Sequence, residues 1–129
     1  MAAPAQTTSD LLADSRSALE DELYDVAHAK LTQYLQQAST PEDRREGIIL
    51  LAQTLYGQKR YQDMLQILEQ NRKLADGSPQ ADAFEFWLAM ANFEKGSWAQ
   101  VVTACRLLDQ QYSQSQYRSR ALRLEAIAL

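Results

Sequence analysis

The chain of 129 residues is long enough for one domain with a hydrophobic core, and its four glycines and three prolines favour helices over a turn-rich β-fold. Its formal net charge of −4 argues against binding to nucleic acid or to acidic lipids, because both need a basic surface. No apolar run is long enough to span a bilayer, and the single cysteine excludes an internal disulfide and a multi-cysteine metal site.

The first residues are small and polar, and they lack the basic and apolar parts of a secretory signal. Two interpretations stay open. The start is either an ordinary flexible terminus or the beginning of a mature exported protein that carries a methionine in place of its signal. We expect residues 1–7 to form a flexible tail, and we favour a periplasmic or envelope location over a cytoplasmic one.

Apolar residues three and four positions apart predict a first helix over 7–22 and a second over 24–38. Ser9 is the expected N-cap of the first helix. Thr40 and Pro41 then predict the start of a third helix, because threonine caps well and proline needs no hydrogen bond at the first helical position.

The third helix is expected over 41–58 and the fourth over 61–74. Ser78 and Pro79 repeat the Thr40-Pro41 pattern before the next helix. Residues 84–108 then predict two amphipathic helices that meet at a tight turn, and small residues between large ones allow these helices to interlock through Trp87 and Trp98. A last helix is expected from about Gln116.

The chain contains an internal repeat with a period of 37 residues, which separates Tyr24 from Tyr61 and Tyr61 from Trp98. Four further sets share this spacing: Leu50, Trp87 and Leu124; Ala52, Ala89 and Ala126; Thr54, Ala91 and Ala128; Leu31, Leu68 and Cys105. Several independent columns at one spacing are the signature of a repeat protein.

The repeat resembles the tetratricopeptide family, whose usual period is about 34 residues. Its third copy has Leu88-Ala89 at the family's Leu-Gly pair, Phe93 at its aromatic position, Gly96-Ser97-Trp98 at its turn and Val101 at its small residue. The resemblance implies an all-α fold, a superhelical stack of antiparallel helix pairs with about seven helices. It also implies one domain over 8–129, with repeats at roughly 8–39, 40–77, 78–114 and a truncated fourth at 115–129.

A narrower likeness covers 107–124, which resembles the loop and Ala-Leu helix of bacterial envelope proteins of this fold, with Ser113 in place of their proline. Those proteins include the lipoprotein of the outer-membrane barrel-assembly machinery and the Tol–Pal-associated coordinator. Residues 122–129 are apolar on one face and have no polar cap. We therefore expect the N-terminal fragment of a longer repeat protein that self-associates through this face; a natural C-terminal helix acting as its own cap is the alternative.

No residue pattern indicates catalysis, a metal site or a cofactor, so we do not expect an enzyme. His28 has no metal ligand or nucleophile at helical spacing, and Cys105 shares an apolar column. Two charged groups are interpreted as solvated surface, namely the acids Glu20, Asp21, Glu22 and Asp25, and the basic Arg118, Arg120 and Arg123.

In stacked helical hairpins the first helix of each pair lines the inner, concave face. The residues expected to face this groove are Ile49, Gln53, Tyr56, Phe86, Met90 and Phe93, with Arg16 and Glu94 at its margins. Exposed aromatic and methionine side chains suit the binding of a peptide or helix from a protein partner. The sequence therefore favours an interaction scaffold, and the alternative is an auxiliary or oligomerisation domain of a larger enzyme or envelope complex.

Overall fold

The computed structural model describes residues 7–129, which form eight α-helices and no strand. Their bounds are α1 (Thr8–Glu20), α2 (Tyr24–Gln37), α3 (Pro41–Gly57), α4 (Tyr61–Gln70), α5 (Arg72–Ala75), α6 (Ala81–Glu94), α7 (Trp98–Gln111) and α8 (Arg118–Ala128). The all-α prediction is confirmed. No helix in this part of the chain has the length and apolar character needed to cross a membrane.

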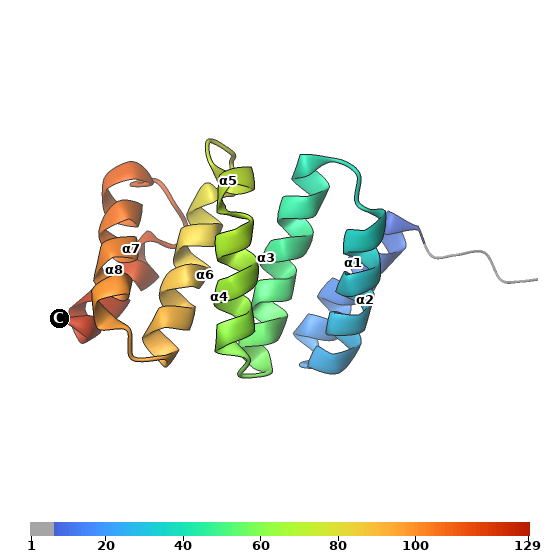
Figure 1. Cartoon of the computed structure of the whole chain (residues 1–129), viewed down its shortest axis with the longest axis horizontal. Coiled ribbons are helices and arrows are strands. Elements are labelled where there is room, and N and C mark those ends of the chain that lie inside the picture. The colour runs from blue at the N-terminus through green and yellow to red at the C-terminus, as the bar shows by residue number, and fades with distance from the viewer. Residues whose placement is uncertain (1–6) are drawn as a thin grey trace, which may run out of the picture.

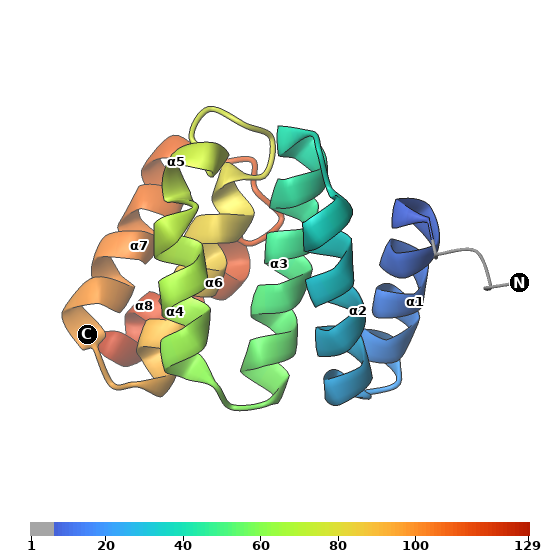
Figure 2. The same cartoon turned by 45° about the vertical axis from the view of Figure 1, so that its right-hand side comes forward.

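The helices lie side by side along the long axis of the molecule, from α1 at one end to α7 and α8 at the other (Figure 1). Helices α1, α3, α6 and α8 contact one another in succession, and we call them the first-helix row. The second helices α2, α4 and α7 each contact two members of this row and, within 7–129, do not contact one another (Figure 2). Pockets lie between neighbouring second helices, one against α3 and one against α6.

Local capping chemistry sets several helix starts. Thr40 caps α3 by accepting a hydrogen bond from the backbone N of Asp43 at 3.1 Å, and Pro41 is the first helical residue, as predicted. The predicted cap of α1 is wrong, because Thr7 and not Ser9 accepts from the backbone N of Asp10. Apart from Thr7, the predicted flexible tail lies outside the described residues.

Two other predicted boundaries are also wrong. Ser78 and Pro79 do not start a helix, since the Ser78 hydroxyl accepts from the backbone N of Gln80 and α6 begins at Ala81. The single helix expected over 61–74 is divided at Asn71, whose side-chain amide donates to the carbonyl of Ile67 at 2.8 Å. This local bond offers the backbone an alternative to the continuing helix, and it explains why eight helices form where about seven were expected.

The same turn recurs three times at the 37-residue period. Glu22, Lys59 and Gly96 all have left-handed backbone, with φ values of 58°, 61° and 74°. In each turn the next residue donates its N–H to the carbonyl five positions earlier, at 2.8, 2.8 and 2.9 Å. This is the Schellman arrangement that ends a helix. It places the starts of α2, α4 and α7 at Tyr24, Tyr61 and Trp98, the three residues that define the repeat in the sequence.

A glycine substitution tests this repeated turn. A side chain in the left-handed region costs roughly 1–2 kcal/mol, offset in part by the greater chain entropy that glycine loses on folding. Lys59→Gly is therefore expected to raise the free energy of unfolding by about 0.5–1 kcal/mol, and Gly96→Ala to lower it by about 1 kcal/mol. Urea denaturation measures both. Lys95→Gly, at a residue with φ of −84°, is the control and is expected to destabilise; a gain of stability there would contradict the explanation.

The core follows the repeat as well. Ala27, Met64 and Val101 are fully buried one turn into the second helices, and Leu31, Leu68 and Cys105 are fully buried one turn later. On the first helices, Ser15, Ala52 and Ala89 form a fully buried column of small side chains. Small residues at this position let the helix backbones approach closely. The sequence repeat is thus also a repeat of packing environments.

Candidate functional site

A continuous series of aromatic rings joins three members of the first-helix row. Tyr56 on α3 lies edge-on to Trp87 on α6 at 5.9 Å between ring centroids, and Trp87 lies edge-on to Phe86 at 5.1 Å. Phe86 stacks on Tyr117, the residue before α8, at 4.6 Å. The guanidinium of Arg120 lies 4.5 Å from the Phe86 centroid and 6.0 Å from that of Trp87, within cation–π range.

Trp87 and Tyr117 carry polar atoms that lie near each other in this series. The indole Nε1 of Trp87 is buried without a hydrogen bond of normal geometry, although the Tyr117 hydroxyl is near enough to interact with it. Burial raises the pKa of Tyr117, so this hydroxyl stays protonated at neutral pH. The series therefore combines apolar ring faces with neutral polar groups.

Tyr56 links the aromatic series to a charged residue at the end of α6. Its hydroxyl donates to Oε1 of Glu94 at 2.9 Å. Burial and this hydrogen bond together raise the pKa of Tyr56 to about 12. Two residues predicted for the groove are thus brought together, and Tyr56 acts as a neutral donor held by a carboxylate.

A pocket of about 370 Å³ lies beside the aromatic series, between α1, α3, the start of α6 and Tyr117. Its apolar floor includes Ile49 and Leu50, and Arg16 at its rim forms an ion pair with Glu46. Two of the predicted groove residues, Arg16 and Ile49, therefore line one concave feature. Because Arg16, Glu46 and Asp82 also line this pocket, it suits a polar side chain of a bound peptide.

The prediction that Phe86 faces the groove is wrong, because Phe86 is 0% exposed beneath Tyr117 and Arg120. Ile49, one repeat earlier, is only 9% exposed. The half-buried residues at this surface are the next ones along each helix, Leu50 and Trp87. Successive residues of a helix point about 100° apart. Assigning the groove face one residue too early therefore selects side chains that point into the core.

The other predicted groove residues have mixed positions. Gln53 and Met90 are half-buried, and Met90 packs against two of the core clusters. Phe93 is half-buried and lies edge-on to Trp98 at 5.3 Å. Trp98 is 46% exposed, and its remaining contact with Phe93 joins α7 to α6, in line with the expected packing of this hairpin.

Sequence reasoning missed Trp87, Tyr117 and Arg120 as members of this surface. The column of Leu50, Trp87 and Leu124 carries the relevant signal, because all three are half-buried in the structure. Arg120 was assigned to a solvated basic group, and nothing in the local sequence indicates that a ring lies beneath it. Its partners Phe86 and Trp87 are more than thirty positions away in the chain.

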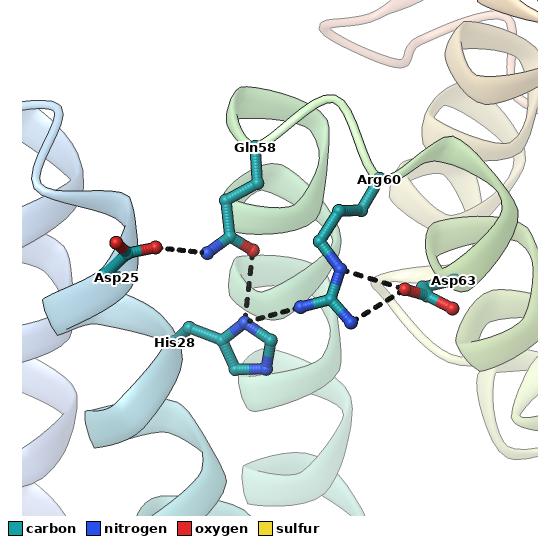
Figure 3. A network of polar contacts seen from close by, with 5 residues as sticks. All are labelled: Asp25, His28, Gln58, Arg60 and Asp63. Carbon is teal, nitrogen blue, oxygen red and sulfur yellow. Dashed lines mark hydrogen bonds and ion pairs between the residues drawn. The ribbon is translucent and has the colours of Figure 1, made fainter.

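His28 belongs to a polar network that joins α2 to the α3–α4 turn (Figure 3). The side-chain nitrogen of Gln58 donates to Asp25 at 2.8 Å. The side-chain oxygen of Gln58 is thereby turned toward Nδ1 of His28, 3.0 Å away. Nδ1 therefore donates, and Arg60, whose NH1 lies 3.4 Å away, pairs instead with Asp63 at 2.8 Å. The network contains no serine, threonine or cysteine, and its hydrogen bonds hold the turn against α2.

Cys105 lies fully buried in the core, as its apolar column predicts. Burial raises the pKa of its thiol to about 11, which keeps the thiol protonated and unreactive at neutral pH. Among residues 7–129, no three His, Cys, Asp or Glu side chains are placed to hold a metal ion. The acidic residues Glu20, Asp21 and Glu22 are exposed, in keeping with a solvated helix end.

The buried tyrosines predict a loss of stability at alkaline pH. The pKa values of Tyr34, Tyr56, Tyr112 and Tyr117 are raised in the folded chain, chiefly by burial. Between pH 10 and about 12 the unfolded chain loses protons that folded Tyr56 retains, so unfolding is favoured as pH rises. The stabilisation is complete below pH 10. Urea midpoints are expected to fall above that pH, and less steeply in Tyr56→Phe; an equal fall in both proteins would contradict this role of Tyr56.

Comparisons of the chain with protein-family models, with curated proteins and with solved structures found no match.

Proposed function

We propose that this chain is a tetratricopeptide-like interaction scaffold that binds a peptide or helix of a protein partner across its first-helix row. The aromatic series from Tyr56 to Tyr117, with Arg120 above it and the pocket beside it, is the observation that carries the proposal. Tryptophan, tyrosine and arginine are enriched among the few residues that supply most of the binding energy at protein interfaces. Each first helix contributes to the surface, so a ligand that crosses the row contacts several repeats.

The family assignment is supported by the threefold recurrence of one turn and by the buried columns that share its period. Repeat proteins of this kind present an extended binding face along their stacked units. Within the same proposal, the chain acts in the bacterial cell envelope.

Selection of peptides followed by binding measurements tests the site. Peptides from a random display library are selected on the chain, and their dissociation constants are measured by calorimetry. Met90→Glu and Arg120→Ala are each expected to weaken binding by about tenfold or more, because both alter the first-helix row. Val26→Glu on α2, at a side chain 47% exposed, is the matched control and is expected to bind normally. Peptides that bind all four proteins equally would exclude this surface.

Self-association is a second candidate function, favoured by exposed apolar side chains of α8 and the residue that follows it. Leu122, Ile127 and Leu129 are 39%, 67% and 77% exposed. Exposed apolar area of this kind can become buried in an assembly. Light scattering at increasing concentration is expected to show dimers that Ile127→Glu abolishes; a strictly monomeric chain at high concentration would contradict this role.

A further inference from the structure

A pocket of about 240 Å³ lies against α6, in the groove between α4 and α7. Helix α6 supplies Glu85, Leu88 and Asn92, which share one helix face at spacings of three and four residues. Helix α7 supplies Thr103 and Leu107. Helices α4, α5, α6 and α7 all contribute to the pocket, which has both apolar and polar walls.

Glu85 is a buried carboxylate with an incomplete set of partners. The residue is 6% exposed, and its Oε1 accepts two hydrogen bonds from Arg72, at 3.0 Å from Nε and 2.7 Å from Nη2. Its Oε2 is buried with no hydrogen-bond partner in the described part of the chain. A carboxylate oxygen without a donor is costly in a protein interior, so its presence calls for a physical reason.

The repeat shows that packing does not require this charge. Glu85 stands at the position held by Leu11 and Ile48 in the two preceding repeats, and both are essentially fully buried. An apolar residue at this position would avoid burying a charge and would often be at least as stable. A residue that breaks an otherwise consistent pattern marks a site selected for something other than the fold.

The ionisable side chains of this pocket are Glu69, Glu85 and Arg72, and their net charge is negative. The Arg72 side chain is 50% exposed and comes from the short helix α5. Its guanidinium can therefore turn toward solvent while the backbone of α5 stays in place. The hydroxyl of Thr103 donates to the carbonyl of Ala99, which leaves its oxygen lone pairs free to accept. The pocket therefore offers acceptors and a negative charge beside the apolar side chains of Leu88 and Leu107.

We propose that this pocket binds an alkylammonium group of about the size of a lysine side chain. The ammonium donates to Oε2 of Glu85 as Arg72 turns outward, and the hydrocarbon part lies against Leu88 and Leu107. An organic cation fits better than a metal ion, because residues 7–129 place no group of three metal-binding side chains together. The cation comes either from a free primary amine or from a lysine of a bound chain, and both sources share this chemistry.

NMR titration of the whole chain tests the proposal. With n-butylammonium chloride at constant ionic strength, saturable shifts are expected at the amides of Leu88, Asn92 and Thr103, and n-butanol is expected to give none. N-acetyl-lysine methylamide distinguishes the sources: tighter binding than butylammonium indicates a peptide lysine, and weaker binding indicates a free amine. Shifts that n-butanol reproduces, or the absence of saturable shifts with either amine, would overturn the proposal.

Variants test which carboxylate binds the ammonium group. Glu85→Gln is expected to weaken ammonium binding by about tenfold or more. Glu85→Ile restores the residue type of the earlier repeats, and it is expected to fold as well as the parent chain and to lose binding. Asp63→Asn, in the corresponding groove between α2 and α4, is the matched control and is expected to bind normally. Equal binding by the parent chain and Glu85→Ile would exclude Glu85 as the group that binds the ammonium.

Met90→Glu and Arg120→Ala in the first-helix row are expected to leave this titration unchanged. The peptide-binding proposal and the ammonium-binding proposal can therefore fail independently.

Discussion

Replacing Phe86 by alanine is expected to lower the free energy of unfolding by about 3–5 kcal/mol, the range for truncation of a buried aromatic ring. The side chain is 0% exposed and stands between Trp87, Tyr117 and Arg120. Its removal deletes apolar contacts, opens a cavity and leaves Arg120 without the ring face beneath it. Urea unfolding followed by circular dichroism measures the change.

Phe93 provides the comparison for this experiment, because it is on the same helix but half-buried. Phe93→Ala is expected to cost roughly half as much, since part of its ring already contacts water. If Phe86→Ala cost less than Phe93→Ala, Phe86 would face solvent as the sequence pattern predicted, and the position of the whole aromatic series would be wrong.

Replacing Ala89 by leucine is expected to lower the free energy of unfolding by about 1–3 kcal/mol, the usual cost of overpacking. Ala89 is fully buried in a cluster with Phe86, Val101 and Cys105. No space remains there for three further carbon atoms unless the helices move apart. The same denaturation experiment measures the change, and a mutant of unaltered stability would show that α6 does not pack closely at this position.

Ala126→Leu is the matched control, because Ala126 stands at the same position of the repeat on α8 but is exposed. Its stability is expected to change by no more than about 0.5 kcal/mol, as for most surface substitutions. The contrast tests a property of repeat arrays: a given position is buried only where a neighbouring helix covers it.

Local sequence determined the parts of the fold that depend on neighbouring residues in the chain. The Thr40-Pro41 start of α3 and the repeated turns before Tyr24, Tyr61 and Trp98 follow from capping groups and backbone conformation within a few residues. The helical class and the 37-residue period follow from apolar spacing in the same way. These features could be predicted because their causes are short in range.

The tertiary structure alone decided which side of each first helix faces outward. Helix α6 contacts α3, α4, α7 and α8, so apolar residues occur around most of its circumference and its sequence has no clear polar stripe. Whether Phe86 or Trp87 meets solvent then depends on how α8 places Tyr117 and Arg120. The pairing of Glu85 with Arg72 also requires the chain to break at Asn71 and return, which no local pattern indicates.

By itself, then, the sequence determined that this protein is an array of helix pairs with a fixed period, because hydrogen bonds and steric limits within a few residues set helix ends and turns. Only the tertiary structure decided which rings form the outer surface and which carboxylate lies in the α4–α7 groove. Those choices depend on contacts between helices far apart in the chain, and the residues next to each position in the sequence do not specify them.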